Sequence, residues 1–119
     1  MKLKLRLIPR RNRIKPAKFK EQWTELQKFC KSKDTWPLAA INADKLLDEA
    51  LKKKRLKGKS MGERLVEAQK LLTDNDGVWH AHNMAKKLLD DSYGKLKESD
   101  VKKSLVGVRQ ALRDLGALE

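Results

Sequence analysis

The residues of this sequence that could do chemistry include two histidines, a single cysteine and a pair of aspartates. His80 and His82 are two positions apart, and on a helix that spacing turns their side chains to different faces. Histidines that bind zinc from one helix are four residues apart. We therefore expect no metal site and no cofactor. One histidine should be exposed, and the other should lie at the edge of the core.

Asp44 and Asp48 are four residues apart, which places both carboxylates on one face of a helix. Such a pair could hold a cation or orient a basic group. Alternatively, Asp44 is a boundary acid that pairs with a Lys or Arg of another helix. The pattern favours that pairing, because charges at the edge of a core are usually paired.

The chain carries +13, and eight of its 29 basic residues lie in the first 18 positions, which contain no acid. This imbalance indicates a polyanionic partner. The N-terminal candidates for contact with nucleic acid are Lys2, Lys4, Arg6, Arg10, Arg11, Arg13 and Lys15.

A second basic cluster follows in the middle of the chain, at Lys52, Lys53, Lys54, Arg55, Lys57 and Lys59. Six cations in eight residues at a helix end can meet phosphates. They can equally be an ordinary solvated helix end. If the N-terminal segment folds against this end, the two clusters form one patch.

Apolar residues recur at spacings of three and four along most of the chain, which predicts helices. The fold class is therefore all-α: one up-and-down bundle of about five helices over residues 16–119, with a basic flexible tail at residues 1–15. The first helix begins at Pro16 or Ala17 and includes Cys30 on its apolar stripe. Nothing next to Cys30 would activate the thiol, so we expect it to be buried and inert.

Helix boundaries follow from capping residues. Thr35 is the expected N-cap of the second helix, which carries small residues in its middle, and Gly58 can end it in a left-handed conformation. Ser60 and Glu63 form a capping box for the third helix. The fourth helix begins near Asp76. The fifth has Ser99 as its expected N-cap and Gly116 as its stop.

Three runs carry a resemblance to known proteins: residues 36–51, residues 58–65 and Trp79-His80-Ala81-His82. Over about residues 19–115 the chain resembles a family of small uncharacterised helical proteins of candidate-phyla bacteria. That family is in turn similar to the HEPN superfamily of helical bundles. The resemblance implies a HEPN-like bundle that associates with RNA and commonly dimerises.

Many HEPN domains are RNases whose motif is an Arg followed, after four to six residues, by a His, often with Asn after the Arg. The resemblance places those residues near positions 85, 86 and 90, where this chain has Ala85, Lys86 and Asp90. An RNase needs an acid–base group and a donor for the phosphate, and Ala85 supplies neither. A site rearranged around His82 and Asp90 is the remaining catalytic alternative.

The sequence therefore predicts a non-catalytic, cytoplasmic module that binds RNA or a ribonucleoprotein through its basic residues. Two alternatives stay open. One is a homodimeric protein–protein module without nucleic acid. The other is a protein that associates with a membrane surface through Leu3, Leu5, Leu7 and Ile8 together with the neighbouring cations.

Overall fold

The computed structural model describes residues 13–119, and this part of the chain is an all-α bundle, as the sequence predicts. Two short 3-10 segments, η2 and η3, connect α2 to α3. The elements are α2 (Pro16–Gln27), η2 (Lys28–Lys31), η3 (Lys33–Thr35), α3 (Trp36–Lys53), α4 (Met61–Glu67), α5 (Asn75–Leu89) and α6 (Glu98–Asp114).

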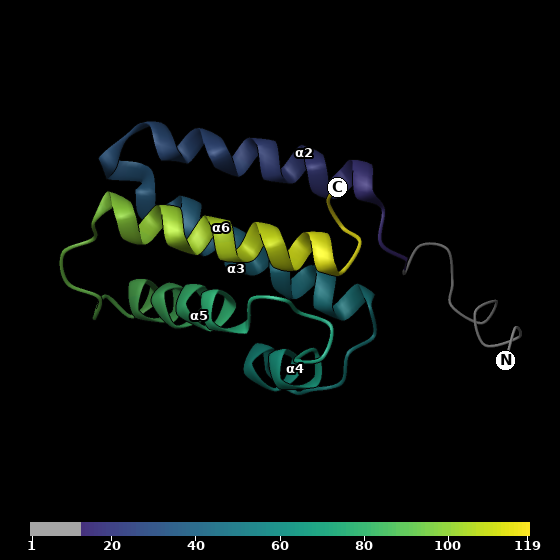
Figure 1. Ribbon diagram of the computed structural model, residues 1–119. Coiled ribbons are helices and arrows are strands. Elements are labelled where there is room, and N and C mark those ends of the chain that lie inside the picture. Colours follow the sequence, from purple (N-terminus) through teal and green to yellow (C-terminus); the bar gives the residue numbers. More distant parts are fainter. Residues whose placement is uncertain (1–12) are drawn as a thin grey trace, which may run out of the picture.

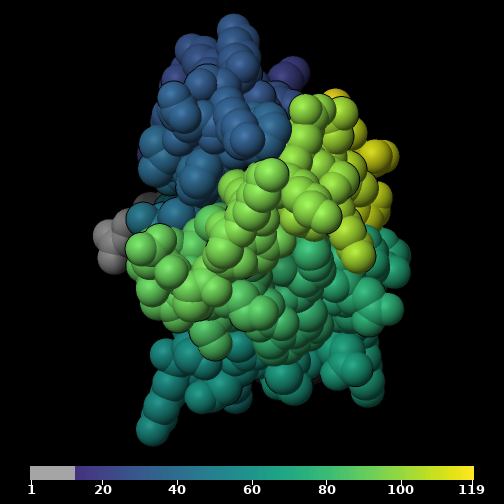
Figure 2. Space-filling view, turned by 90° about the vertical axis from the view of Figure 1, so that its left-hand side faces the viewer, coloured from purple at the N-terminus to yellow at the C-terminus, as the bar shows by residue number. Residues whose placement is uncertain are grey.

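Helix α3 is the centre of the bundle, since it packs against α2, α5 and α6. The end of α3 and the end of α6 lie at the same end of the bundle as the start of α2 (Figure 1). Figure 2 shows the opposite end, where the turn from α2 to α3 lies above the connection from α5 to α6. Among residues 13–119 there is no helix long and apolar enough to cross a membrane.

The small residues of α3 allow this close packing. Ala39, Ala40, Ala43 and Ala50 are completely buried. On the other side of the core, the backbones of α5 and α6 meet at two glycines: a Cβ built on Gly107 would lie 2.7 Å from the carbonyl carbon and oxygen of Gly77. Small side chains thus bring the helices together, as predicted for α3.

One predicted cap forms in part and another has the predicted geometry. The backbone N–H of Glu63 donates to Ser60 Oγ at 3.2 Å, so Ser60 caps α4, but the Glu63 carboxylate accepts from the Lys59 N–H at 3.2 Å instead of completing the capping box at Ser60. Gly116, at φ 81°, follows α6 in the left-handed conformation. Thr35 is also the N-cap residue of α3, but its hydroxyl donates to the carbonyls of Phe29 and Ser32 instead of accepting from the helix.

Three other local predictions are wrong. Helix α6 begins at Glu98 with Lys97 as its N-cap residue, because Glu98 and Asp100 both suit the positive end of the dipole and Ser99 lies inside the first turn. Helix α3 ends before Gly58, and Arg55 adopts the left-handed conformation (φ 61°). Cys30 lies in η2 and is only half-buried, since α2 already ends at Gln27.

Candidate functional site

The predicted cluster of cations occupies the end of α3 and the loop that follows it. Lys52, Lys54, Arg55, Lys57 and Lys59 are exposed, and Lys53 is half-buried. The C-terminal carbonyls of α3 carry partial negative charge, which the surrounding cations offset. The chain turns at Arg55, where the Leu56 N–H donates to the Leu51 carbonyl at 3.2 Å, so the helix ends and Lys57 and Lys59 lie on the loop that follows.

Residues 13–18, which lead from the N-terminal segment into α2, lie next to this cluster. Arg13, Lys15 and Lys18 line the same hollow as Lys53. A second hollow of about 540 Å³ is formed by Arg13 and Ile14 on one side and Lys53, Lys54 and Arg55 on another, with Leu115 and Gly116 at the end of α6. The two basic clusters are therefore adjacent at Arg13. The candidates Lys2, Lys4, Arg6, Arg10 and Arg11 lie outside the described residues.

Acidic residues lie among these cations: Asp48 Oδ2 is 3.6 Å from Lys52 Nζ, and Glu63 Oε1 accepts from the Lys59 N–H at 3.2 Å. Glu49 lines the hollow at Lys18 and a third hollow, of about 620 Å³, beside Lys52 and Lys57. The hollow that Arg13 shares with Arg55 is lined by no acid. Cations outnumber acids around these hollows, and clustered cations attract phosphates because their potentials add.

The loop that carries Lys57 and Lys59 is held in place by an ion pair between α4 and α3. Arg64 donates to Asp48 twice, from Nε to Oδ1 at 2.7 Å and from Nη2 to Oδ2 at 2.9 Å, and its Nη1 donates to the Gly58 carbonyl at 2.9 Å. The hydrogen bond to Asp48 raises the pKa of Arg64 further above its usual value. Asp48 therefore forms the interhelical pair that the sequence predicts for its neighbour Asp44.

Asp44 has a different partner. Its carboxylate faces His82 of α5, with His82 Nδ1 3.1 Å from Oδ2 and 3.3 Å from Oδ1, and both residues are 8 % exposed. Burial raises the pKa of Asp44, the hydrogen bond and charge of His82 oppose that rise, and the nearby Asp48 adds to it. The His82 and Trp79 rings also form a T-shaped contact, with ring centroids 6.0 Å apart and an interplanar angle of 70°. Sequence spacing could not pair residues 38 positions apart.

The positions singled out by the HEPN resemblance do not converge. Ala85 is in the core, whereas Lys86 is exposed. Asp90 is the C-cap residue of α5 and accepts hydrogen bonds from the backbone and hydroxyl of Ser92. His82 points instead to Asp44, so the structure does not bring His82 and Asp90 together as one site.

Cys30 and His80 are the remaining residues that could do chemistry. Burial raises the pKa of the Cys30 thiol, which makes it less reactive. His80 is half-buried, not exposed, and its Nε2 has no partner among the residues described. Residues 13–119 hold no group of three His, Cys, Asp or Glu side chains placed to bind a metal.

Comparisons with known proteins add no relative to this description. No family model, no curated protein and no solved structure matches the chain.

Proposed function

We propose that this chain is a non-catalytic module that binds RNA, free or within a ribonucleoprotein, through the basic end of its bundle. The observation that carries the proposal is the adjacency of Arg13, Lys15 and Lys18 to the Lys52–Lys59 cluster. Cations from two distant parts of the sequence line shared hollows, as expected for a surface that follows a phosphate backbone.

Contacts of this kind position a polyanion without reading its sequence. The proposal contains no cleavage step: the side chain of Ala85 lies in the core and can neither take a proton nor bind a phosphate. Affinity should therefore depend steeply on salt. Six phosphate contacts on a single strand correspond to a slope of about −4 in a plot of log affinity against log salt.

The test is the fluorescence anisotropy of a labelled single-stranded RNA at several KCl concentrations. Lys54→Glu/Lys57→Glu reverses two exposed cations of the basic end, and Lys102→Glu/Lys103→Glu reverses two exposed cations at the start of α6, at the opposite end. We expect the first variant to lose about tenfold in affinity at moderate salt and the second to lose less than twofold. Equal losses would show only a net-charge effect, and no binding by the unmodified chain would overturn the proposal.

A truncation tests the N-terminal cations separately. Deleting residues 1–12 removes Lys2, Lys4, Arg6, Arg10 and Arg11 but keeps Ile14, which packs against the core, so the bundle should keep its stability. We expect most of the RNA affinity to be lost. Unchanged affinity would remove the N-terminal segment from the proposed interface. Binding to anionic vesicles instead of RNA would favour the membrane-surface alternative.

A further inference from the structure

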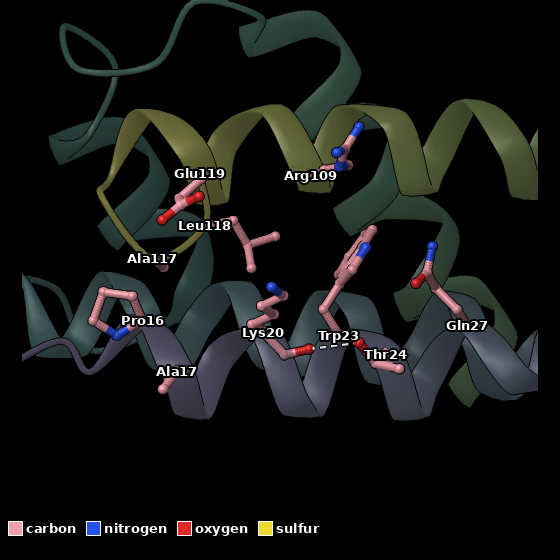
Figure 3. Close-up of a pocket in the computed structure, with 10 residues that line it drawn as sticks. All are labelled: Pro16, Ala17, Lys20, Trp23, Thr24, Gln27, Arg109, Ala117, Leu118 and Glu119. Carbon is pink, nitrogen blue, oxygen red and sulfur yellow. Dashed lines mark hydrogen bonds between the residues drawn. The ribbon is translucent and has the colours of Figure 1, made fainter.

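Helices α2 and α6 enclose a groove of about 780 Å³ on a side of the bundle that the proposed RNA contacts do not use (Figure 3). None of its lining residues lines the hollows of the basic end. Its volume is in the range of sites for small organic ligands, roughly 300–1,000 Å³. The lining residues are Pro16, Ala17, Lys20, Trp23, Thr24, Gln27, Arg109, Ala117, Leu118 and Glu119.

The floor of the groove presents an unused hydrogen-bond donor. Trp23 is only 7 % exposed, and its ring rises from α2 toward α6 (Figure 3). Its indole N–H has no acceptor among residues 13–119, whereas the indole of Trp36 donates to the Cys30 carbonyl at 3.1 Å. The indole nitrogen itself stays open to solvent in the groove, so a ligand oxygen can reach it and accept its hydrogen bond in place of water.

The walls add positive charge. Lys20 on α2 and Arg109 on α6 stand on opposite sides of the groove, and neither has an ion-pair partner in the described part of the chain. Glu119 is the one acidic lining residue, and Figure 3 places it beside Leu118 at the Pro16 end, away from Trp23 and Arg109. An anionic group is therefore favoured near Arg109 and disfavoured near Glu119.

We propose that this groove binds a small amphiphilic carboxylate. The carboxylate accepts hydrogen bonds from the guanidinium of Arg109 and the indole N–H of Trp23, with Lys20 nearby, and the apolar body lies along Leu118 and Ala117. Arg suits this role because its planar fork matches the two carboxylate oxygens. The proposal is independent of RNA binding.

The test uses octanoate as the probe and octanamide as its uncharged analogue. Two-dimensional ¹H–¹⁵N NMR of the full chain reports the indole N–H signal of Trp23, which is assigned by its loss in Trp23→Phe. We expect octanoate to shift that signal saturably at millimolar concentration or below, and octanamide to bind at least tenfold more weakly.

Arg109→Gln should weaken octanoate binding about tenfold, whereas Arg113→Gln, one turn further along α6 and exposed, should not change it. Both changes are on exposed side chains, so both variants should fold even if Trp23→Phe does not. Equal affinities of the two Arg variants, equal binding of octanamide, or no shift at 10 mM octanoate would each overturn the proposal.

Discussion

His82 and Asp44 join α5 to α3 inside the bundle, with His82 Nδ1 3.1 Å from Asp44 Oδ2 and 3.3 Å from Oδ1. The contact gives a buried carboxylate a partner and gives a buried imidazole an acceptor. Each residue alone would be costly in this position, because an unpaired polar group loses its hydration on burial. The pair therefore has a structural role that explains both residues.

Two substitutions of Asp44 distinguish the contribution of its hydrogen bond to His82 from that of its negative charge. Asp44→Ala leaves His82 Nδ1 without a partner and should lower the free energy of unfolding by about 2–3 kcal/mol. Asp44→Asn keeps an oxygen that can accept from Nδ1 and should stay within about 1 kcal/mol of the parent chain. Urea unfolding at pH 7 measures both. Loss of RNA affinity in Asp44→Ala without any loss of stability would instead give Asp44 a functional role.

The pH dependence of this pair has a definite sign. Burial raises the pKa of Asp44 in the folded state above its ordinary value of 3.8, so the folded state holds this proton more tightly than the unfolded state. The contribution of Asp44 to stability is therefore greatest below pH 3.8 and is lost as the pH rises through the raised pKa. The Tm of the parent chain relative to Asp44→Asn should fall over that interval and then level off. A relative Tm that rises with pH would contradict the raised pKa.

The sequence predicted the helices well because their signal is local. The spacing of apolar residues and the Ser60 cap both act within one or two turns, so they can be recognised without knowing the fold. The partners across the bundle could not be predicted in this way. The pairing of Asp44 with His82, and the position of Arg109 across a groove from Trp23, depend on how helices are rotated about their axes.

The end of α3 also could not be predicted from local sequence. Gly58 was the expected left-handed residue after α3 because glycine adopts that conformation most easily. The structure uses Arg55 instead, since ending there lets Leu56 pack against the core. A tertiary contact thus overrides a local preference, and a single sequence carries no sign of that contact.

Arg64 should not tolerate replacement by lysine. Arg64→Lys keeps the charge but cannot donate in parallel to both oxygens of Asp48 and also reach the Gly58 carbonyl. We expect a loss of about 1–2 kcal/mol in the free energy of unfolding. Lys52 also faces Asp48, at 3.6 Å, but is exposed, so Lys52→Ala should change stability by less than about 0.5 kcal/mol. Similar losses in the two variants would argue against the special role of the guanidinium.

Substitution of Gly107 tests the close contact between α5 and α6, and Gly62 of α4 provides a control. A Cβ at position 107 would lie 2.7 Å from backbone atoms of Gly77, which cannot move without shifting the helix, so Gly107→Ala should cost about 2–3 kcal/mol. A Cβ at position 62 would lie 3.8 Å from its nearest neighbours, so Gly62→Ala should be neutral or stabilise by up to about 1 kcal/mol. Thermal unfolding of both variants measures the difference. A stable Gly107→Ala would mean that the two backbones are further apart than described.

Arg55 connects stability to the proposed function, because it occupies a left-handed position (φ 61°) at the junction of two basic hollows. Non-glycine residues pay a conformational cost there, so Arg55→Gly should raise the free energy of unfolding by roughly 0.5–1 kcal/mol. The same variant removes a cation from the proposed interface and should reduce RNA affinity several-fold and the magnitude of the salt slope by about 0.7.

The matched control is Asp91→Gly, which relieves the same conformation (φ 61°) after α5 at the other end of the bundle. It should stabilise the fold by a similar or smaller amount, since aspartate adopts this conformation more readily than arginine, and it should leave RNA affinity unchanged. Urea unfolding and RNA anisotropy, measured on both variants, separate the two effects. If Arg55→Gly gained stability and also kept its full RNA affinity, Arg55 would have no part in the interface, even if the neighbouring lysines did.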